Sequence, residues 1–425
     1  MTTAPSPERA ARSLYVCYLG LDDPLVHTQV VAYLAGLSRR GHVVRLLTFE
    51  TGRMPRERRD HLRARLALQG IAWHVLRYHK RPTLAATIYD VICGAAVSAY
   101  LMRRHRLDVL HARSHMPAAM GLIASLFVPL RLLFDIRGLM AEEYVDAGRW
   151  RRRSLAFRLT KLVERRAIRR ADGAVVLTEA ARRLLFRDGD PRVAVIPCCV
   201  DASGPAGPAA RSRRIRARLA LGDRPVLTYI GKFGGWYLQR EMVDFFARAR
   251  RVIPDLHFLV LSQSDPSLVL CEFERAGVPG TAYTIARAEP AEVGAYLALA
   301  DAAIAFIRPC HSKLASSPTK IGEYLVSGLP VVTGAGIGDV DRLLEQYDVG
   351  VVLQSFEPAS LDEGVRRLSA RMAEAGHAER CRRAAAERLS LAGVGVPRYD
   401  AVYRRLAGEP GARRHERARG LGRPA

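Results

Sequence analysis

Short apolar runs alternate along the chain with longer segments in which apolar residues recur at helical spacing. Residues 13–20 form one such run, which ends in glycine and leads into Asp22, so they are predicted to be a buried strand entering a loop. Residues 26–40 follow with near-helical spacing and a basic last turn that stops at Gly41, before a second apolar run at 42–49. This pattern predicts a strand, helix, strand unit.

The alternation continues in two blocks. In the first block, strands are predicted at 72–76, 109–111, 132–136, 174–177 and 193–196, with helices at 84–105 and from Pro117. In the second block, strands are predicted at 226–230, 258–261, 283–286, 302–306, 330–333 and 350–353. Strands that alternate with helices imply a parallel sheet covered on both faces, so the fold class is α/β with two doubly wound domains.

The domain boundaries follow from this pattern and from proline and glycine. The first domain is expected over 13–200 and the second over 215–390, joined by a Pro/Gly-rich linker at 201–214. A C-terminal helix at 391–406 is expected to return toward the first domain, and 1–12 and 407–425 are expected to be disordered. A cleft at the carboxyl ends of the two sheets is the expected ligand site.

Length and composition agree with two globular domains. The 425 residues are 49% hydrophobic and 25% charged, which excludes a disordered chain. The seven cysteines are scattered, without CxxC spacing or a secretory leader before them, so a reduced, cytoplasmic setting is expected. Residues 84–102 are just long enough to span a bilayer but contain Asp90 and Gly94, and 116–130 are too short, so both are predicted to be buried helices rather than spans.

The net charge of +24 calls for an anionic partner: nucleic acid, an acidic lipid surface or a phosphorylated substrate. Residues 149–170 hold ten basic residues against one acid, with Leu155, Leu159 and Leu162 on one helical stripe. Such a helix can pack its leucines inward and turn its arginines toward anionic phospholipid, or it can be a solvated surface helix. Nucleic acid is not expected, since aromatic residues are 7% and no nucleic-acid-binding signature interrupts the pattern.

The most informative segment is 316–332, SSPTKIGEYLVSGLPVV. Ser316 and Ser317 offer an N-cap ahead of Pro318, and a helix is predicted from Thr319 to Val326, which Gly328 ends. A helix N-terminus at the carboxyl edge of a sheet, with Lys320 beside it, favours a phosphate or diphosphate.

Glu323 lies one turn further along this helix. Its carboxylate can accept two hydrogen bonds from the vicinal hydroxyls of a ribose, and the alternative is an ion pair with a nearby arginine.

PTKIGEYLVSGLPVV, followed by GDVDRLLEQYDVGVV, resembles the nucleotide-sugar signature of the family 4 glycosyltransferases, which are retaining enzymes of the GT-B fold. The resemblance runs in order over residues 13–405. It implies that Glu323 holds the donor ribose as the last glutamate of an E-x7-E signature. The first glutamate is replaced by Ala315, which suggests an SPTK-type subgroup.

Residues 227–235, LTYIGKFGG, are similar to the family's phosphate loop. Gly231 would let the backbone approach the ligand, and Lys232 would face the leaving diphosphate. The family carries a further lysine where this chain has Leu238, and Arg240 is the candidate replacement. Together with Ser317, Thr319 and Lys320, these residues form the expected donor site. The alternative for Lys232 is a solvated loop lysine.

Residues 134–138, FDIRG, with Glu142, resemble the family's first-domain loop that faces the donor. Asp135 and Arg137 are the catalytic candidates there, together with Lys232 and Lys320, and a structural ion pair is the alternative. Gly20, His111 and Glu142 are the acceptor-side candidates. His111 and His115 have the spacing of half a zinc motif but lack a third ligand, so no metal site is expected.

The resemblance implies a hexosyl- or acetylhexosaminyltransferase that moves a sugar with retention from a nucleotide sugar, expected to be a UDP-sugar, to a hydroxyl. The acceptor would belong to polysaccharide or glycoconjugate assembly and could be lipid-linked, which would place the protein in the cytoplasm or at the inner face of the membrane. No metal or other cofactor is expected, because lysines and a helix N-terminus can stabilise the departing diphosphate. Two alternatives stay open: a GT-B nucleotide-sugar epimerase or hydrolase, and a non-catalytic basic protein that binds nucleic acid or membrane.

Overall fold

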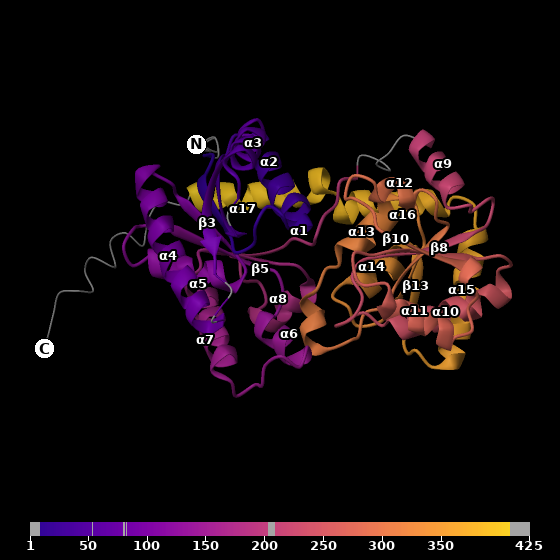
Figure 1. Cartoon of the computed structure of the whole chain (residues 1–425). Helices are drawn as coiled ribbons and strands as arrows, with labels where there is room; N and C mark the ends of the chain where they lie inside the picture. The colour runs from indigo at the N-terminus through magenta and orange to yellow at the C-terminus, as the bar shows by residue number, and fades with distance from the viewer. Residues whose placement is uncertain (1–8, 53, 80, 82, 203–208, 409–425) are drawn as a thin grey trace, which may run out of the picture. The chain divides into compact units, whose positions relative to one another are not determined.

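The structure is a computed structural model that describes residues 9–52, 54–79, 81, 83–202 and 209–408 (Figure 1). The chain divides by its contacts into two compact units. Unit 1 comprises Met1–Leu177, Arg182–Ile196 and Val396–Ala425, and unit 2 comprises Thr178–Ala181 and Pro197–Gly395. The expected disordered ends lie for the most part outside the described residues, although β1 already begins at Arg12 and the last helix extends to Gly408.

Unit 1 is built on a seven-stranded parallel sheet in the order β3-β2-β1-β4-β5-β6-β7. The strands are β1 (Arg12–Cys17), β2 (Val43–Thr51), β3 (Ile71–Tyr78), β4 (Val109–Arg113), β5 (Arg131–Ile136), β6 (Gly173–Val176) and β7 (Val193–Val195). Every strand predicted for the first block is present. The sheet order reverses between β1 and β4, and such a switch point is where open α/β sheets bind ligands.

The helices of unit 1 cover both faces of this sheet (Figure 1). They are α1 (Pro24–Val26), which continues through the π-helical turn His27–Val31 into α2 (Ala32–Arg39), and α3 (Arg56–Ala67), α4 (Thr83–Arg104), α5 (His115–Ala124), α6 (Met140–Asp146), α7 (Leu155–Arg170) and α17 (Val396–Gly408). The helix α8 (Glu179–Leu185) is divided between the units, since its residues up to Ala181 belong to unit 2 and those from Arg182 to unit 1. Right-handed crossovers place α2 and α3 on one face and α4, α5 and α7 on the other. On that second face, α4 packs against α5, and α5 packs against α7.

The last helix, α17, packs against α2 in unit 1. Its Asp400 carboxylate accepts hydrogen bonds from His42 Nε2 at 2.7 Å, from Arg40 Nη1 at 2.8 Å and from Arg404 Nε at 2.8 Å. Burial lowers the pKa of His42, against the opposing effect of Asp400, so this contact is a hydrogen bond to a neutral imidazole at neutral pH. The polar cluster therefore joins α17 to the segment between α2 and β2.

Unit 2 repeats the topology with a six-stranded parallel sheet in the order β10-β9-β8-β11-β12-β13. The strands are β8 (Val226–Ile230), β9 (His257–Leu261), β10 (Tyr283–Ala286), β11 (Ala302–Ala305), β12 (Val331–Gly334) and β13 (Gly350–Leu353), again at the predicted positions. The switch point lies between β8 and β11. Both units therefore have the strand order of dinucleotide-binding α/β sheets.

The helices of unit 2 are α9 (Ala209–Arg218), α10 (Gln239–Val252), α11 (Ser267–Arg275), α12 (Val293–Leu297), α13 (Thr319–Val326), α14 (Val340–Tyr347), α15 (Pro358–Ala373) and α16 (His377–Leu389). Short 3-10 turns occur at Gly280–Ala282 and His311–Ala315, and a π-helical turn at Leu391–Gly395. Residues 209–214, expected to belong to a linker, are the start of α9, whose Ile215 is buried. Residues 203–208 of that linker lie outside the described residues.

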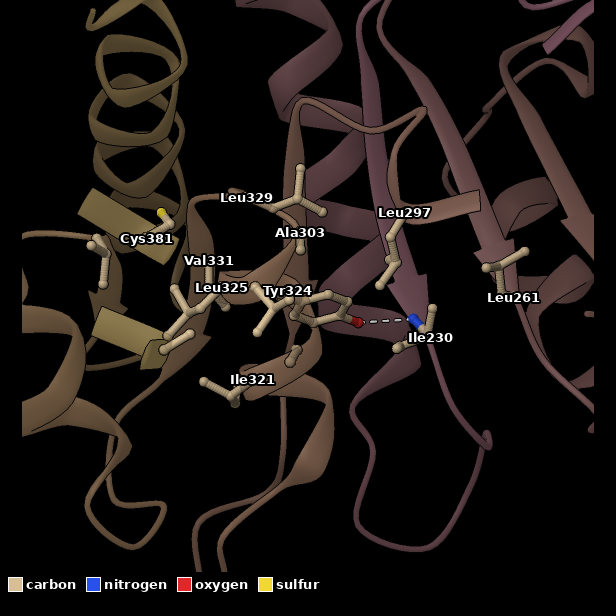
Figure 2. Close-up of a cluster of buried hydrophobic side chains, with 14 of the residues drawn as sticks. Ile230, Leu261, Leu297, Ala303, Ile321, Tyr324, Leu325, Leu329, Val331 and Cys381 are labelled. Atoms are coloured by element: carbon tan, nitrogen blue, oxygen red, sulfur yellow. Dashed lines mark hydrogen bonds between the residues drawn. The ribbon is translucent and has the colours of Figure 1, made fainter. Parts of the chain in front are cut away.

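Two apolar clusters form the core of unit 2, one on each face of its sheet. The cluster in Figure 2 packs Ile321 and Leu325 of α13 against Ala303 of β11 and Val331 of β12. Within it, Tyr324 is fully buried, and the N–H of Ile230 donates to its hydroxyl oxygen at 2.8 Å. This hydrogen bond ties α13 to the carboxyl end of β8.

The structure corrects the expectation for the basic segment 149–170. The helix α7 begins only at Leu155, where Ser154 caps it by accepting a hydrogen bond from the N–H of Phe157. The residues that α7 buries are Thr160, Glu164 and Ala167, whereas Leu155, Leu159 and Leu162 are exposed. The leucine stripe therefore points to solvent, because α7 packs through the opposite face.

The helix α4 was expected to be buried, and only one of its faces is. Among the described residues it is the one helix long and apolar enough to cross a membrane by length and composition. Its buried face includes Asp90, whose carboxylate accepts hydrogen bonds from the Tyr18 hydroxyl at 2.7 Å and the His79 N–H at 3.0 Å. These contacts make α4 an integral part of unit 1.

Candidate functional site

The predicted helix 319–326 is present as α13, and Gly328 ends it with a φ of +80°. Its N-cap differs from the expectation. Pro318 occupies the N-cap position, and Ser317 Oγ instead accepts a hydrogen bond from the N–H of Cys198 at 3.1 Å. Thr319 and Lys320 therefore begin the helix without a side-chain cap, which leaves the helix N-terminus available to an anion.

Lys320 is buried, and its ammonium group is surrounded by aromatic side chains. The Nζ atom lies 4.3 Å from the ring centroid of Tyr229 and 4.0 Å from that of Tyr237, and it donates to the Tyr229 hydroxyl at 3.3 Å. Burial lowers the pKa of Lys320 to about 7, and nearby Glu323 only partly opposes this effect. The cation–π contacts partly stabilise the ammonium charge of Lys320, which burial separates from water.

Gly231 follows β8 and contacts this lysine. It has a φ of +137°, and a Cβ atom at this position would lie 2.6 Å from Lys320 Nζ. The hydroxyl of Tyr229 donates to the carbonyl oxygen of Lys232 at 2.6 Å, so a single tyrosine connects Lys320 to the loop after β8. The structure thus brings together the two segments that the sequence assigned to phosphate binding, within unit 2.

Glu323 lies half-buried on α13, and the described residues offer its carboxylate no hydrogen bond or arginine partner. The alternative of an ion pair with an arginine is therefore wrong. Burial raises the pKa of Glu323, and Lys320 partly offsets this effect. A half-buried acceptor without a partner is suited to receive hydroxyl donors from a ligand.

Lys232 and Arg240 are both exposed. Arg240 is the second residue of α10, and Leu238, the position at which the family has a lysine, is the N-cap of that helix. The side chain of Lys232 makes no hydrogen bond or ion pair with the described residues. It is free to reach a ligand, and it also fits the alternative of a solvated lysine.

Sequence reasoning missed the aromatic lining of this site. Lys313 Nζ lies 3.8 Å from the centroid of the Trp236 ring, as Lys320 lies against Tyr237 one residue further along. Trp236 Nε1 is buried without a hydrogen-bond partner. Two of the five lysines thus contact aromatic rings of one loop, 231–237. The only sequence signal for this aromatic lining is the density of aromatic residues and glycines in YIGKFGGWY.

In unit 1, Asp135 is fully buried near the end of β5. Its carboxylate lies 3.6 Å from Arg137 Nη1, 3.9 Å from Arg113 Nη1 and 3.4 Å from His111 Nε2. Burial alone would raise the pKa of Asp135, but Arg137, His111 and Arg113 outweigh it and hold the pKa at about 2. Asp135 is therefore a weak base, and the geometry suits a residue that orients the two arginines.

The two histidines have separate partners. His111 lies inside β4, which continues to Arg113 beyond the expected end, and its Nδ1 is 2.9 Å from the Tyr403 hydroxyl. His115 begins α5, and its Nε2 is 3.0 Å from Glu164. His111 is buried, so its ring is not exposed at the surface of unit 1. Among the described residues, no group of three or more His, Cys, Asp and Glu side chains is placed to hold a metal ion.

The other acceptor-side candidates have structural contacts. Glu142 is buried with Lys161 Nζ at 2.8 Å, and Lys161 also pairs with Glu164. At Gly20, a Cβ atom would clash with a carboxylate oxygen of Glu50, which accepts a hydrogen bond from the N–H of Leu21. Gly20 therefore allows the loop after β1 to close over Glu50.

The two parallel sheets, each with a switch point between its strands, define an α/β protein of two doubly wound units. Comparison with solved structures identifies the fold as GT-B. The chain is similar to a glycosyltransferase from Rickettsia africae, with a TM-score of 0.70, 12% identity and coverage of 94% of this chain and 100% of that one. It is also similar to HepE from Anabaena in complex with UDP and glucose, with a TM-score of 0.69, 14% identity and coverage of 94% and 100%.

A third similar structure is WaaG, a glycosyltransferase involved in lipopolysaccharide biosynthesis, with a TM-score of 0.65, 17% identity and coverage of 93% and 100%. Residues 26–199 match the family model described as Glycosyl transferase 4-like domain. No curated protein matches the sequence. The fold and this domain are those of glycosyltransferases. The matched residues lie in the N-terminal half of the sequence, whereas the segment around Lys320 lies in the C-terminal half.

Proposed function

We propose that the protein is a glycosyltransferase that moves a hexosyl or acetylhexosaminyl group from a nucleotide sugar to a hydroxyl acceptor. The observation that carries the proposal is the contact of Lys320 with Gly231 at the carboxyl end of β8, beside a helix N-terminus. The 4-like domain at residues 26–199 supports it independently. A UDP-sugar is the proposed donor, because HepE, which shares the fold, binds UDP and glucose.

Each residue of the unit 2 site has a role in this proposal. The diphosphate binds at the N-terminus of α13, where Thr319 and Lys320 present N–H groups and Lys320 supplies the charge. Gly231 lets the backbone approach, and Lys232 covers the diphosphate from the loop. Glu323 accepts hydrogen bonds from the ribose hydroxyls. Ser317 fixes the start of the helix through Cys198 rather than by contacting the donor.

The chemistry requires stabilisation of a leaving group. The bond between the anomeric carbon and the diphosphate breaks, the acceptor oxygen forms the new bond on the same face, and the departing phosphate takes the acceptor's proton. Lys320, protonated when the diphosphate is bound, stabilises the growing negative charge. The proposal uses neither a metal nor a general base from the protein, so the low pKa of Asp135 is compatible with it.

On the acceptor side, we propose that Arg137 contacts substrate and that Asp135 and His111 position it. Arg137 Nη2 already contacts Gln29 Oε1 at 3.4 Å, which links it to the helix after β1. Gly20 and Glu142 then shape the loops rather than touch the acceptor. The acceptor is proposed to be a polysaccharide or glycoconjugate precursor, with retention at the anomeric carbon.

Nucleotide binding tests the proposal directly. UDP or GDP should raise the melting temperature, because a bound ligand adds RT ln(1 + [L]/Kd) to the free energy of unfolding. Lys320→Ala and Glu323→Ala should each remove most of that shift, because each weakens nucleotide binding. Arg251→Ala and Glu345→Ala change exposed residues of the same unit and serve as matched controls. Unchanged nucleotide binding in both site variants would exclude this site.

The reaction class needs a second measurement. With a UDP-sugar alone, a transferase should release little free sugar, and an added acceptor should be glycosylated with retained configuration by NMR. Rapid donor hydrolysis or epimerisation without acceptor would indicate a hydrolase or epimerase. Arg240→Ala tests whether Arg240 takes the role of the family lysine that is replaced by Leu238 in this chain. A smaller rise in melting temperature with UDP in this variant would indicate that Arg240 contacts the diphosphate.

A further inference from the structure

The helix α4 presents an apolar face to solvent along its whole length. Ile88, Tyr89, Ile92 and Tyr100 are exposed there, with Ile92 at 57%. The helix has 22 residues, which span about 33 Å. Its one acidic residue, Asp90, points the other way and is buried. A soluble protein rarely leaves so long a stripe of large apolar side chains uncovered.

The neighbouring helices extend this face. Leu126 and Phe127 follow α5, and Phe127 is 73% exposed. On α7, the exposed Leu155, Leu159 and Leu162 recur at positions i, i+4 and i+7, opposite the buried residues of that helix. The helix α4 packs against α5 and α5 against α7, so the three helices lie together on one side of unit 1 (Figure 1). The exposed apolar residues of these helices are therefore expected to form one face.

Arginine surrounds these apolar residues. The exposed basic residues on and next to α4 and α7 are Arg81, Arg103, Arg104, Arg151, Arg152, Arg153, Arg158, Arg165, Arg166, Arg169 and Arg170. The only acidic residues of α4, α5 and α7 are Asp90 and Glu164, and both are buried. On these three helices the exposed charge is therefore entirely positive.

We propose that this α4–α5–α7 face docks unit 1 onto the surface of an anionic lipid bilayer. Apolar side chains at the centre of a helix face, with arginines on its flanks, match the depth profile of a bilayer interface, where acyl chains lie beneath phosphate groups. Nucleic acid would match the arginines but would leave Ile88, Ile92 and Leu155 in water. A protein partner would not require that every exposed charge be basic.

The face lies in the plane of the membrane and does not span it. The buried side of α4 carries Asp90, hydrogen bonded to Tyr18 and His79, and packs under the sheet. Insertion of α4 across a bilayer would break these contacts and open the core of unit 1. Docking is independent of the proposed sugar transfer, and it would give the protein access to acceptors held in a membrane.

Vesicle flotation tests the proposal. The full chain should float with phosphatidylcholine vesicles that contain phosphatidylglycerol, and far less with pure phosphatidylcholine. Ile88→Glu with Ile92→Glu, and separately Leu155→Glu with Leu159→Glu, should each reduce partitioning at least about tenfold, because each places two carboxylates in the interface. Arg165→Gln with Arg166→Gln should reduce it less, and high salt should abolish that difference.

Leu68→Glu is the matched control, because Leu68 is 89% exposed at the end of α3 on the other face of the sheet. It should float like the wild type. All variants should keep the wild-type melting temperature, since they change exposed positions. The proposal is overturned if the chain does not float, if the isoleucine and leucine pairs behave like Leu68→Glu, or if they instead split a dimer measured by light scattering.

Discussion

The ammonium group of Lys320 lies between two tyrosine rings instead of in water. Burial disfavours its charged form, so its pKa falls to about 7, and the cation–π contacts with Tyr229 and Tyr237 replace only part of the lost hydration. A diphosphate would supply the missing countercharge. The same residue should therefore reduce the stability of the free protein and increase its affinity for nucleotide.

This opposition gives a prediction for Lys320→Met. In the unfolded state Lys320 has a pKa near 10.4, whereas in the folded state its pKa is about 7. Lys320 therefore lowers the free energy of unfolding most at and below neutral pH. The variant should be more stable than the wild type by about 1–2 kcal/mol near neutral pH, with the gain shrinking as pH rises. Chemical denaturation checks this, and a loss of stability at every pH would contradict it.

Nucleotide affinity should depend on pH through the same group. Above its pKa of about 7, free Lys320 is neutral, so binding of a diphosphate must take up a proton. Between about pH 7 and pH 9 the Kd for UDP should therefore rise by up to about tenfold per unit. Calorimetry in buffers of different ionisation enthalpy should detect this uptake. In Lys320→Arg, whose guanidinium stays charged, the slope should disappear, and a slope that persists there would belong to another group.

At this scale the sequence predicted which segments come together better than it predicted the environment of each side chain. Gly231 and Lys320 were singled out from spacing and resemblance, and the structure places Gly231 against Lys320 after β8. The rings of Tyr229 and Tyr237 were not found, because their contact with Lys320 joins residues about 90 positions apart. The surroundings of Asp135 were also not predictable, since they join Arg113 at the end of β4, Arg137 just after β5, and His111.

At the scale of elements, the position of α13 depends on Tyr324. Its hydroxyl accepts from the N–H of Ile230 at 2.8 Å and donates to the carbonyl of Ile304 at 3.4 Å, so one side chain holds the helix to both strands of the switch point. The helix N-terminus can then meet the loop after β8. Its placement is thus decided inside the core shown in Figure 2.

Tyr324→Phe should therefore destabilise unit 2. The N–H of Ile230 would remain buried without an acceptor, which costs about 1–2 kcal/mol. Nucleotide affinity should fall as well, because Gly231 follows Ile230 directly. Tyr347→Phe removes an exposed hydroxyl that contacts Glu387 and should change the free energy of unfolding little. Equal effects of the two substitutions in urea titrations would exclude the positioning role of Tyr324.

Strands were predictable from sequence because buried parallel strands are short, continuous apolar runs. Helix faces were less so. The leucines of α7 satisfy helical periodicity equally well whether they point inward or outward, and only the packing of Thr160, Glu164 and Ala167 decides. Likewise, Ser316 and Ser317 fit a capping pattern, but Ser317 bonds instead to Cys198, which is distant in sequence. Tertiary contacts override local preference in both cases.

At the scale of the whole molecule, the first unit is completed by the last helix. Asp400 of α17 accepts hydrogen bonds from His42, Arg40 and Arg404. Asp400→Ala should destabilise unit 1 by about 2–3 kcal/mol, because it leaves the buried imidazole of His42 without its acceptor and removes the ion pairs with Arg40 and Arg404. Asp60→Ala, which removes an exposed pair with Arg63, should cost little. Hydrogen exchange resolved by unit checks the prediction, and faster exchange in unit 2 alone would contradict it.

Because α17 belongs to unit 1 while Pro197–Gly395 form the greater part of unit 2, the chain leaves its first unit after Ile196 and returns to it at Val396. All of unit 2 is therefore synthesised before the N-terminal sheet receives α17. Domains fold as their residues emerge, so we expect the C-terminal unit to reach its native state first, while the earlier half waits for Val396–Gly408. A chain truncated after Gly395 and released from the ribosome should show a protease-resistant C-terminal unit beside a cleavable N-terminal one.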